Sequence, residues 1–386
     1  MTASAPRAAT RWSVWPATLE TMPPRRFIAW AVLLALAASL FFFSPKLQLW
    51  TFRYEGTFET TRARTFLQQC EAPLRRDIEP AMQWRLLPPL LCHALGLRGR
   101  TALVMPWIGV VALLATCAHC LRREGLTATQ TLLGTVVVAT TSATIVPLGW
   151  FGINDAWAWL GLVVVGFGRG HVSLALACLL CPWIDERFII GLPLACAVRH
   201  ARSASGERFT VFASWRETLQ AGLWLLPYIV TRLTARRFGL HDDSESFIRQ
   251  HLRSCLVWLP WAPLGWWMAC RAGWALVAMA AWHAGRRALM GAIHFGVLIV
   301  ATSVVMIALA ADISRSAALV LPAMLLGVVA LVRLQPPTHA TRSLAWIAGL
   351  NLVIPAAHVV YTKIDLISPL PIELARLLRK IYFPSF

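Results

Sequence analysis

The chain has 386 residues, of which 58% are hydrophobic and only 14% are charged, and its formal net charge at pH 7 is +18. Soluble globular proteins carry about a quarter charged residues, so this composition excludes a water-soluble enzyme, a disordered chain and a collagen-like fibre. Repeated apolar stretches of about 13 to 23 residues instead indicate a multi-pass membrane protein.

The positive charge is carried by arginine, because the 36 basic residues comprise 33 arginines and three lysines. Neither zinc-finger spacing nor a basic helix with interleaved aromatic residues accompanies it, so we expect no nucleic-acid partner. Arginine near helix ends is typical of membrane proteins, because its stem stays in the apolar region while the guanidinium reaches the headgroups. The 18 acidic residues are more informative, since a buried carboxylate is costly.

The N-terminal segment, residues 1–26, is basic and contains proline, and an apolar run follows it at once. No small-residue cleavage site precedes the cluster Phe41-Phe42-Phe43, which predicts an uncleaved signal anchor. Since basic segments stay on the cytoplasmic side, we expect a cytoplasmic N-terminus in an inner (plasma) membrane protein. Residues 45–101 then form a long extracytoplasmic loop, for which we predict juxtamembrane helices.

The expected fold class is an all-α polytopic transmembrane bundle of about 11 spans. The transmembrane domain covers residues 27–361, and residues 362–386 form a short extracytoplasmic C-terminal segment. The predicted spans between 155 and 200 are short for a bilayer, so we expect them to be tilted or re-entrant. After the first span, the predicted spans lie near 102–120, 129–150, 155–168, 171–183, 188–200, 218–233, 257–282, 289–310, 316–333 and 343–361.

This topology places most of the 18 carboxylates on the extracytoplasmic side. Asp155, Asp185 and Asp312 lie there at span ends or in short turns rather than in open loops. Such a bias arises when arginine is kept on the other side, and also when separate elements bring partly desolvated acids into one site. The embedded positions favour a site, although Asp155 and Asp185 also suit helix capping, and Asp312 with Arg315 suits a structural ion pair.

The first outer loop combines carboxylates with arginines. A carboxylate at the membrane face can deprotonate an acceptor hydroxyl, and an arginine can hold the phosphate of a lipid-linked donor. The loop therefore predicts chemistry on a lipid phosphate. Its candidate residues are Glu55, Glu59, Arg62, Arg64, Asp77, Glu79 and Arg85.

Four short motifs occur in order along the chain, namely Tyr54-Glu55-Gly56-Thr57-Phe58, Arg85-Leu86-Leu87-Pro88-Pro89-Leu90-Leu91, Asp185-Glu186-Arg187-Phe188 and Asp312-x-x-Arg315. They resemble the Tyr-Asp-Gly-x-Phe, Arg-x-Leu-x-Pro-Leu-Leu, Asp-x-Arg-Phe and Asp-x-x-Arg segments of some bacterial membrane proteins. Those proteins belong to the GT-C superfamily of integral-membrane, polyprenyl-phosphate-sugar-dependent glycosyltransferases. The resemblance covers roughly residues 27 to 335.

The resemblance implies a glycosyltransferase that moves a sugar from a polyprenyl-phosphate-linked donor to a lipid, glycan or protein acceptor. The active site would lie on the periplasmic or extracellular face. The implied reaction is an inverting single displacement in which Glu55 is the base and Arg85 stabilises the departing lipid phosphate. The family pattern has Asp where Glu55 stands and often an aromatic residue at the position of Glu59, so Glu59 is the alternative base.

The same resemblance suggests residues that contact the donor phosphate or another part of the substrates. It implies no definite cofactor: Asp77-Ile-Glu79 is only a loose equivalent of an Asp-x-Asp metal motif, so a divalent cation stays open. The candidate contacts are Arg62, Arg64, Asp77, Glu79, Arg85, Asp155, Asp185, Arg187, Asp312 and Arg315.

Two other classes of protein compete with this interpretation. A polysaccharide polymerase or ligase also uses arginine-rich outer loops, but its large loop would come late in the chain. A multi-pass lipid or solute transporter would show inverted halves with interrupted helices and polar groups near the midplane, and we find no internal symmetry in the sequence.

Overall fold

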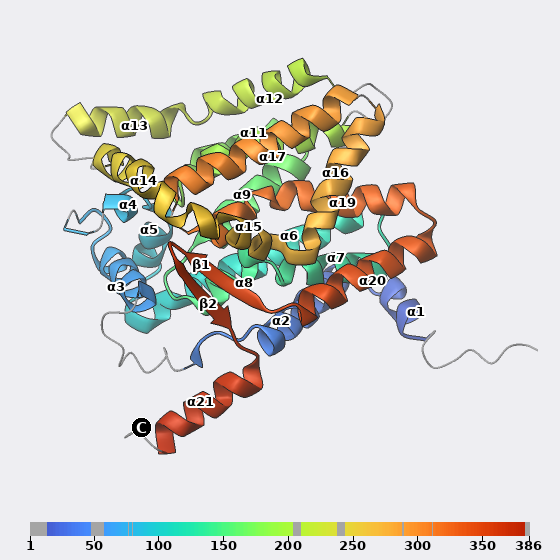
Figure 1. Ribbon diagram of the computed structural model, residues 1–386, viewed down its shortest axis with the longest axis horizontal. Helices are drawn as coiled ribbons and strands as arrows, with labels where there is room; N and C mark the ends of the chain where they lie inside the picture. Colours follow the sequence, from blue (N-terminus) through green and yellow to red (C-terminus); the bar gives the residue numbers. More distant parts are fainter. Residues whose placement is uncertain are drawn as a thin grey trace, which may run out of the picture.

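The computed structural model is a helical bundle with one short β-hairpin near its C-terminal end (Figure 1). The expected all-α class is confirmed, since the hairpin is the one sheet in the part of the chain that the structure describes. The described residues are 14–47, 58–75, 77–78, 80–203, 210–237, 244–287, 289–310 and 312–382.

Four helical segments are long and apolar enough to cross a bilayer. A fifth arises if α7 (Ala128–Ala139) and α8 (Ser142–Gly149), which bend by 54° at their junction, are counted as one span. The predicted count of 11 spans is therefore not supported by the described residues. The four segments are α2 (Pro24–Phe42), Gly99–Arg123 (η3, Gly99–Leu103, with α6, Val104–Arg123), α17 (Leu289–Leu309) and Ile313–Leu334 (α18, Ile313–Ser316, η7, Ala317–Val320, and α19, Leu321–Leu334).

Most of the other predicted spans correspond to shorter helices. The predictions near 155–168, 171–183 and 188–200 are each a helix of 17 residues or fewer. These helices are too short to cross about 30 Å of hydrocarbon unaided, as expected for tilted or partly embedded elements. The shorter elements are α1 (Val14–Thr21), α7 (Ala128–Ala139), α8 (Ser142–Gly149), α9 (Asp155–Phe167), α10 (Gly170–Leu180), η4 (Cys181–Trp183), α11 (Arg187–Ser203) and α20 (Pro337–Val353).

Three predicted spans are wrong because each was predicted as one continuous helix and covers more than one element. The run 257–282 breaks at Arg271, whose φ of +47° no regular helix contains. The run 218–233 covers two helices, and the run 343–361 ends as a β-strand after Pro355. The elements involved are α12 (Val211–Leu223), α13 (Leu226–Arg237), α14 (Ser244–Trp258), η5 (Leu259–Trp261), α15 (Ala262–Cys270), η6 (Arg271–Gly273), α16 (Trp274–Arg287) and β1 (Ala356–Val360).

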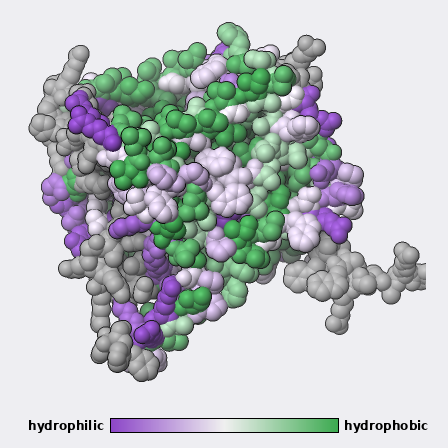
Figure 2. Space-filling view, viewed as in Figure 1, coloured by the Kyte–Doolittle hydropathy of each residue, from purple (hydrophilic) through white to green (hydrophobic). Residues whose placement is uncertain are grey.

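The centre of the bundle is formed by α6, α9, α11 and α19. In the segment Ile313–Leu334, 83% of the apolar window is buried, against 28% in both α2 and α17. The outer helices expose their apolar side chains, and Figure 2 shows apolar surface across the middle of this face with hydrophilic residues toward its left and right margins. This arrangement is that of a membrane protein with α19 inside and α2 and α17 facing lipid.

Acidic residues lie at both ends of the bundle. At the end where α2 begins, Glu124 pairs with Arg202 at 2.9 Å and Arg333 at 2.6 Å, and Glu20 pairs with Arg122 at 3.3 Å. The acids at the turns before α9, α11 and α18 lie at the opposite end. The predicted separation of these acids onto two ends is thus present in the structure.

The first loop contains the predicted juxtamembrane helices, which lie at the left in Figure 1. They form a small core of their own, in which Phe66 and Cys92 pack with Met105 and Phe151. The β-hairpin and a final helix occupy the same end of the bundle. These elements are α3 (Phe58–Glu71), α4 (Pro80–Gln83), α5 (Leu87–Ala94), β2 (Lys363–Ile367) and α21 (Leu370–Tyr382).

The close contact between α19 and α16 at Gly327 allows a test of the helix packing. A Cβ at Gly327 of α19 would lie 1.8 Å from the backbone oxygen of Leu276 in α16. Gly327→Ala should therefore lower the free energy of unfolding by about 1–3 kcal/mol, because that oxygen cannot rotate away. Thermal unfolding in detergent measures the change. Gly349→Ala is the control, because no atom lies within 4 Å of its Cβ position, and equal stability of the two variants would contradict this packing.

Candidate functional site

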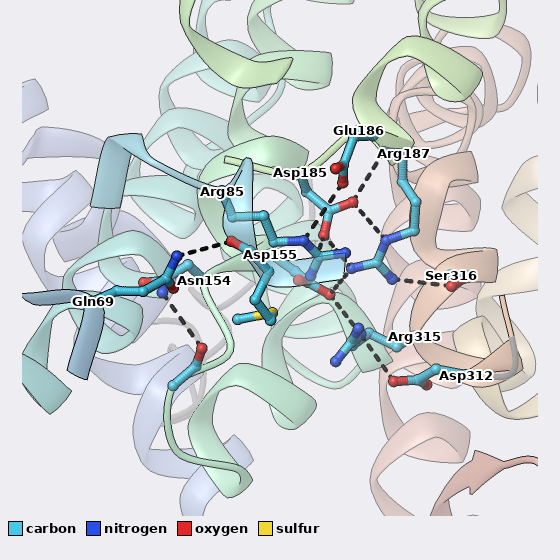
Figure 3. Close-up of polar contacts among 12 residues, drawn as sticks. Gln69, Arg85, Asn154, Asp155, Asp185, Glu186, Arg187, Asp312, Arg315 and Ser316 are labelled. Atoms are coloured by element: carbon cyan, nitrogen blue, oxygen red, sulfur yellow. Dashed lines mark hydrogen bonds and ion pairs between the residues drawn. The ribbon is translucent and has the colours of Figure 1, made fainter. Parts of the chain in front are cut away.

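Charged side chains from separate elements meet at the end of the bundle that holds the first-loop helices (Figure 3). Arg85 comes from the turn between α4 and α5, and Asp155 is the first residue of α9. Asp185 and Arg187 come from the turn into α11, and Arg315 comes from α18. We call this group, together with Glu186 and Asp312, the charge cluster.

Asp155 and Asp185 each join two arginines. The Oδ2 atom of Asp155 lies 2.7 Å from Arg187 Nη2 and 2.8 Å from Arg315 Nε. The Oδ2 atom of Asp185 lies 2.6 Å from Arg187 Nη2 and 3.0 Å from Arg85 Nη1. The ion pairs therefore form a continuous network that ties α9, α11 and α18 to the first loop.

The outer members extend the cluster on both sides. Arg315 Nε lies 3.0 Å from Asp312 Oδ2, which confirms the pair three residues apart. Arg85 Nε lies 3.5 Å from Glu186 Oε2. Because Arg315 also contacts Asp155, the Asp312 pair is part of the network rather than an isolated surface bridge.

The cluster is deeply buried, with Asp185 fully covered and Asp155 only 2% exposed. Burial by itself would raise the pKa of Asp185, but Arg187 and Arg85 outweigh that effect and hold the pKa well below its usual range. Burial likewise opposes the charge of Arg85, and Asp185 and Glu186 keep its pKa above the usual value. Asp185 and Arg85 therefore favour their charged forms through their partners.

Local sequence explains how the turns deliver these side chains. Gly152 adopts φ +80°, and a Cβ there would lie 3.0 Å from the backbone oxygen of Arg62. The glycine thus lets the turn before α9 lie against α3. The Oδ1 atom of Asp185 accepts the backbone N–H of Arg187 at 2.9 Å, so Asp185 caps α11 and pairs with arginine at once.

A small cavity lies beside the cluster. It has a volume of about 20 Å³, which is room for about one water molecule. The polar side chains that line it include three arginines, which come from three separate elements, and a single carboxylate. These lining residues are Arg62, Arg85, Asp155 and Arg315, with Gln69 and Asn154 beside them.

The remaining predicted residues lie elsewhere or outside the described residues. Arg64 is exposed on α3, and Asp77 is exposed, with its Oδ1 accepting Arg75 Nε at 2.7 Å. Glu55 and Glu79 lie outside the described residues. Glu59 falls within α3, but its side chain lies outside the described part of the structure.

Several residues of the site were missed in the sequence. Arg232 lies 3.3 Å from Glu186 Oε1 and 4.7 Å from the ring of Trp84. His358 Nδ1 lies 3.5 Å from Asp312 Oδ1. Both lie within runs that we predicted as membrane spans. The signal available in the sequence was one charged or polar residue inside a mostly apolar run, which indicates a functional or paired residue.

Among the described residues, no group of three or more His, Cys, Asp or Glu is placed to hold a metal ion. The carboxylates of the cluster are instead directed at guanidinium groups. The arrangement can therefore fix arginines at one end of the bundle and present them to an anion.

Comparison with known proteins finds no family model, no curated protein and no solved structure that matches this chain. The fold and the cluster by themselves describe a helical membrane protein with a buried network of ion pairs at one end. Any more specific function is a proposal.

Removal of one carboxylate tests the network. Asp185→Asn should lower the free energy of unfolding by about 3–5 kcal/mol, because it leaves Arg85 and Arg187 short of a buried counter-charge. Asp77→Asn is the matched control, since its carboxylate is exposed, and we expect no measurable change.

The pH dependence of the Asp185 contribution has a definite sign. A depressed pKa means that the contribution is complete above the unfolded-state pKa and is lost as the pH falls toward the folded-state value. The stability difference between wild type and Asp185→Asn should be constant from about pH 8 to pH 6 and shrink below about pH 4. Thermal unfolding in detergent across this range measures it, and a difference that shrinks near neutral pH would contradict the depressed pKa.

Proposed function

We propose that this chain is a membrane glycosyltransferase that moves a sugar from a polyprenyl-phosphate-linked donor to an acceptor. The observation that supports it is the cavity that Arg62, Arg85 and Arg315 line together with Asp155. Guanidinium groups match phosphate oxygens in two-pronged geometry, and three of them in one lining suit a phosphate leaving group. A lipid phosphate lies at the membrane surface, where the cluster end of the bundle is proposed to be.

The proposal includes an orientation and a fold family. The end with Glu20 and Glu124 is cytoplasmic, and the cluster faces the periplasmic or extracellular side of the inner membrane. The basic segment before α2 supports this orientation through the positive-inside rule. The bundle is of the GT-C type, in which the first outer loop covers the site.

In the proposed reaction an acceptor hydroxyl attacks the anomeric carbon of the donor sugar. The bond from that carbon to the phosphate oxygen breaks, and its electron pair leaves with the polyprenyl phosphate. Glu55 takes the hydroxyl proton, with Glu59 as the alternative, and the anomeric configuration inverts. Arg85, Arg62 and Arg315 stabilise the leaving phosphate.

Phosphate entry requires an exchange of ion-pair partners, because the cavity holds only about one water molecule. Arg85 is suited to this exchange: its side chain is 18% exposed, and its contact with Glu186 at 3.5 Å is longer than its 3.0 Å contact with Asp185. We propose that Arg85 leaves Glu186 and takes the phosphate. Asp155, Asp185, Arg187 and Asp312 then act as positioning residues, and Arg64, Asp77 and Glu79 are proposed as outer contacts of the substrates.

A second candidate function, solute or lipid transport, is favoured by the two broken helices. The α7–α8 bend lies against the α15–α16 break, where Arg271 donates to the backbone oxygen of Thr140 and Ser142 Oγ donates to that of Ala269 at 3.2 Å. Interrupted helices that meet inside a bundle are a feature of transporters. Transport would proceed without cleavage of a sugar–phosphate bond.

Donor cleavage tests the proposed function. Membranes that contain the chain should release polyprenyl phosphate from at least one member of a panel of synthetic polyprenyl-phosphate sugars, above membranes that lack the chain. Glu55→Gln should reduce release about 10²-fold or more, as expected for loss of a general base. Glu71→Gln is the matched control in the same loop, and we expect it to be fully active.

Each result has a defined meaning. Loss of activity in Glu59→Gln instead of Glu55→Gln would make Glu59 the base. Full activity in both would contradict the first-loop base. If no donor is cleaved while liposomes that contain the chain carry solute or lipid across the bilayer, transport replaces transfer.

A further inference from the structure

A second and larger cavity lies at the cluster end, between the β-hairpin and the loop after α8. Its volume is about 470 Å³, within the range of small-molecule sites. The side chains that line it include Trp150, His358, Tyr361, Lys363 and Asp365. None of these residues belongs to the arginine-lined cavity. We call this space the hairpin cavity.

The register of the hairpin builds one wall of this cavity. His358 of β1 pairs directly with Asp365 of β2, and Val360 pairs with Lys363. Residues two apart on a strand share a face, so Lys363 and Asp365 lie on the same face of the hairpin as His358, whose ring is buried beneath them. An apolar strand pair would have left this wall without hydrogen-bonding groups.

The hairpin turn holds an aromatic ring at the rim of the cavity. Tyr361 has φ +52°, a left-handed conformation that is costly for a residue with a bulky side chain. Its ring packs edge-on against Trp258 with a centroid distance of 5.5 Å, yet Tyr361 stays 43% exposed. The strained turn thus presents an aromatic ring to the opening.

The charges around the hairpin cavity nearly balance. Lys46 pairs with Asp365 and lies 5.3 Å from the centroid of the Trp150 ring. Lys363 adds one further positive charge, so two of the three lysines of the chain lie here. The lining of the other cavity carries three arginines and one carboxylate. A phosphate therefore suits the arginine-lined cavity, and an uncharged ligand with many hydroxyls suits the hairpin cavity.

One chain of contacts joins the two cavities. His358 Nδ1 lies 3.1 Å from Ser314 Oγ and 3.5 Å from Asp312 Oδ1. Asp312 contacts Arg315, which lines the arginine-lined cavity. The backbone of Asp312 also forms a β-bridge with Val360. Asp312 and α18 therefore contact His358 and Val360 of the hairpin and also supply Arg315 to the arginine-lined cavity.

We propose that the hairpin cavity binds a saccharide and that, in the proposed transferase, this saccharide is the acceptor. The ring of Tyr361 contacts the C–H face of a sugar, and Lys363 and Asp365 bond to its hydroxyl groups. The acceptor role rests on the proposed function, whereas saccharide binding does not.

Direct binding tests the site. The full-length protein in detergent is applied to a printed array of mono- to tetrasaccharides, and affinity for any retained sugar is then measured in solution. Tyr361→Gly removes the ring and relieves the left-handed strain, so the variant should fold while its affinity falls about tenfold or more. Lys363→Ala should weaken binding similarly, because Lys363 lines the cavity. Tyr382→Ala, on exposed α21, is the matched control and should bind as wild type does.

Three outcomes would overturn the proposal. Wild-type protein that retains no saccharide has no such site. Unchanged affinity in Tyr361→Gly and Lys363→Ala would place the sugar elsewhere. Displacement of the saccharide by millimolar inorganic phosphate would make the cavity an anion site instead.

Arg85→Ala separates this proposal from the proposed function. It should abolish donor cleavage and leave saccharide affinity unchanged, because Arg85 does not line the hairpin cavity. Saccharide binding by a wild-type protein that cleaves no donor would contradict the transferase and keep the site. Donor cleavage without saccharide binding would contradict the site and keep the transferase.

Discussion

The carboxylate of Asp155 is the contact on which the cluster end of the molecule depends. It joins Arg187 at the start of α11 to Arg315 of α18, and it lies on the first residue of α9. Three charges buried this deeply each carry a desolvation penalty of several kcal/mol, which is offset only while the partners stay together. The three elements are therefore fixed relative to one another at this end, and the first loop is attached to them through Arg85.

This constraint accounts for the short helices. The helices α9 and α11 begin at or next to the cluster, and α18 begins beside Asp312. Since the first-loop helices pack over the same end of the bundle, these helices need not extend to the surface on that side. The C-terminal end of α9 is held by arginines in turn: Arg199 and Arg202 both donate to the backbone oxygen of Gly168, directly after α9.

Hydropathy alone could predict much of this fold. It located α2, α6 and α17 to within a few residues, because each is an uninterrupted apolar run that ends at polar residues or a turn. It missed the break at Arg271, because side-chain hydropathy does not report a backbone in the left-handed region. It also extended α20 into β1, although Pro355 and the β-branched pair Val359-Val360 were available signals.

The site was predictable where acids interrupt apolar sequence in short turns. Asp155, Asp185 and Asp312 were found in this way, and the arginines beside two of them came with their motifs. Arg232 and His358 were not found, because their partners are distant in sequence. Glu186 is 46 residues from Arg232, and Asp312, next to α18, is contacted by His358 from β1. Pairing of this kind is set by the tertiary structure alone, and a single sequence does not report it.

The cluster is better explained by specificity than by stability. Replacing a buried ion-pair network with apolar side chains of similar volume is often neutral or stabilising. A chain that is 58% hydrophobic could fill this space with aliphatic residues, as it does around α19. Ion pairs in place of such packing hold guanidinium groups at fixed positions beside a cavity. That arrangement suits recognition of an anion by arginines that are already positioned before it arrives.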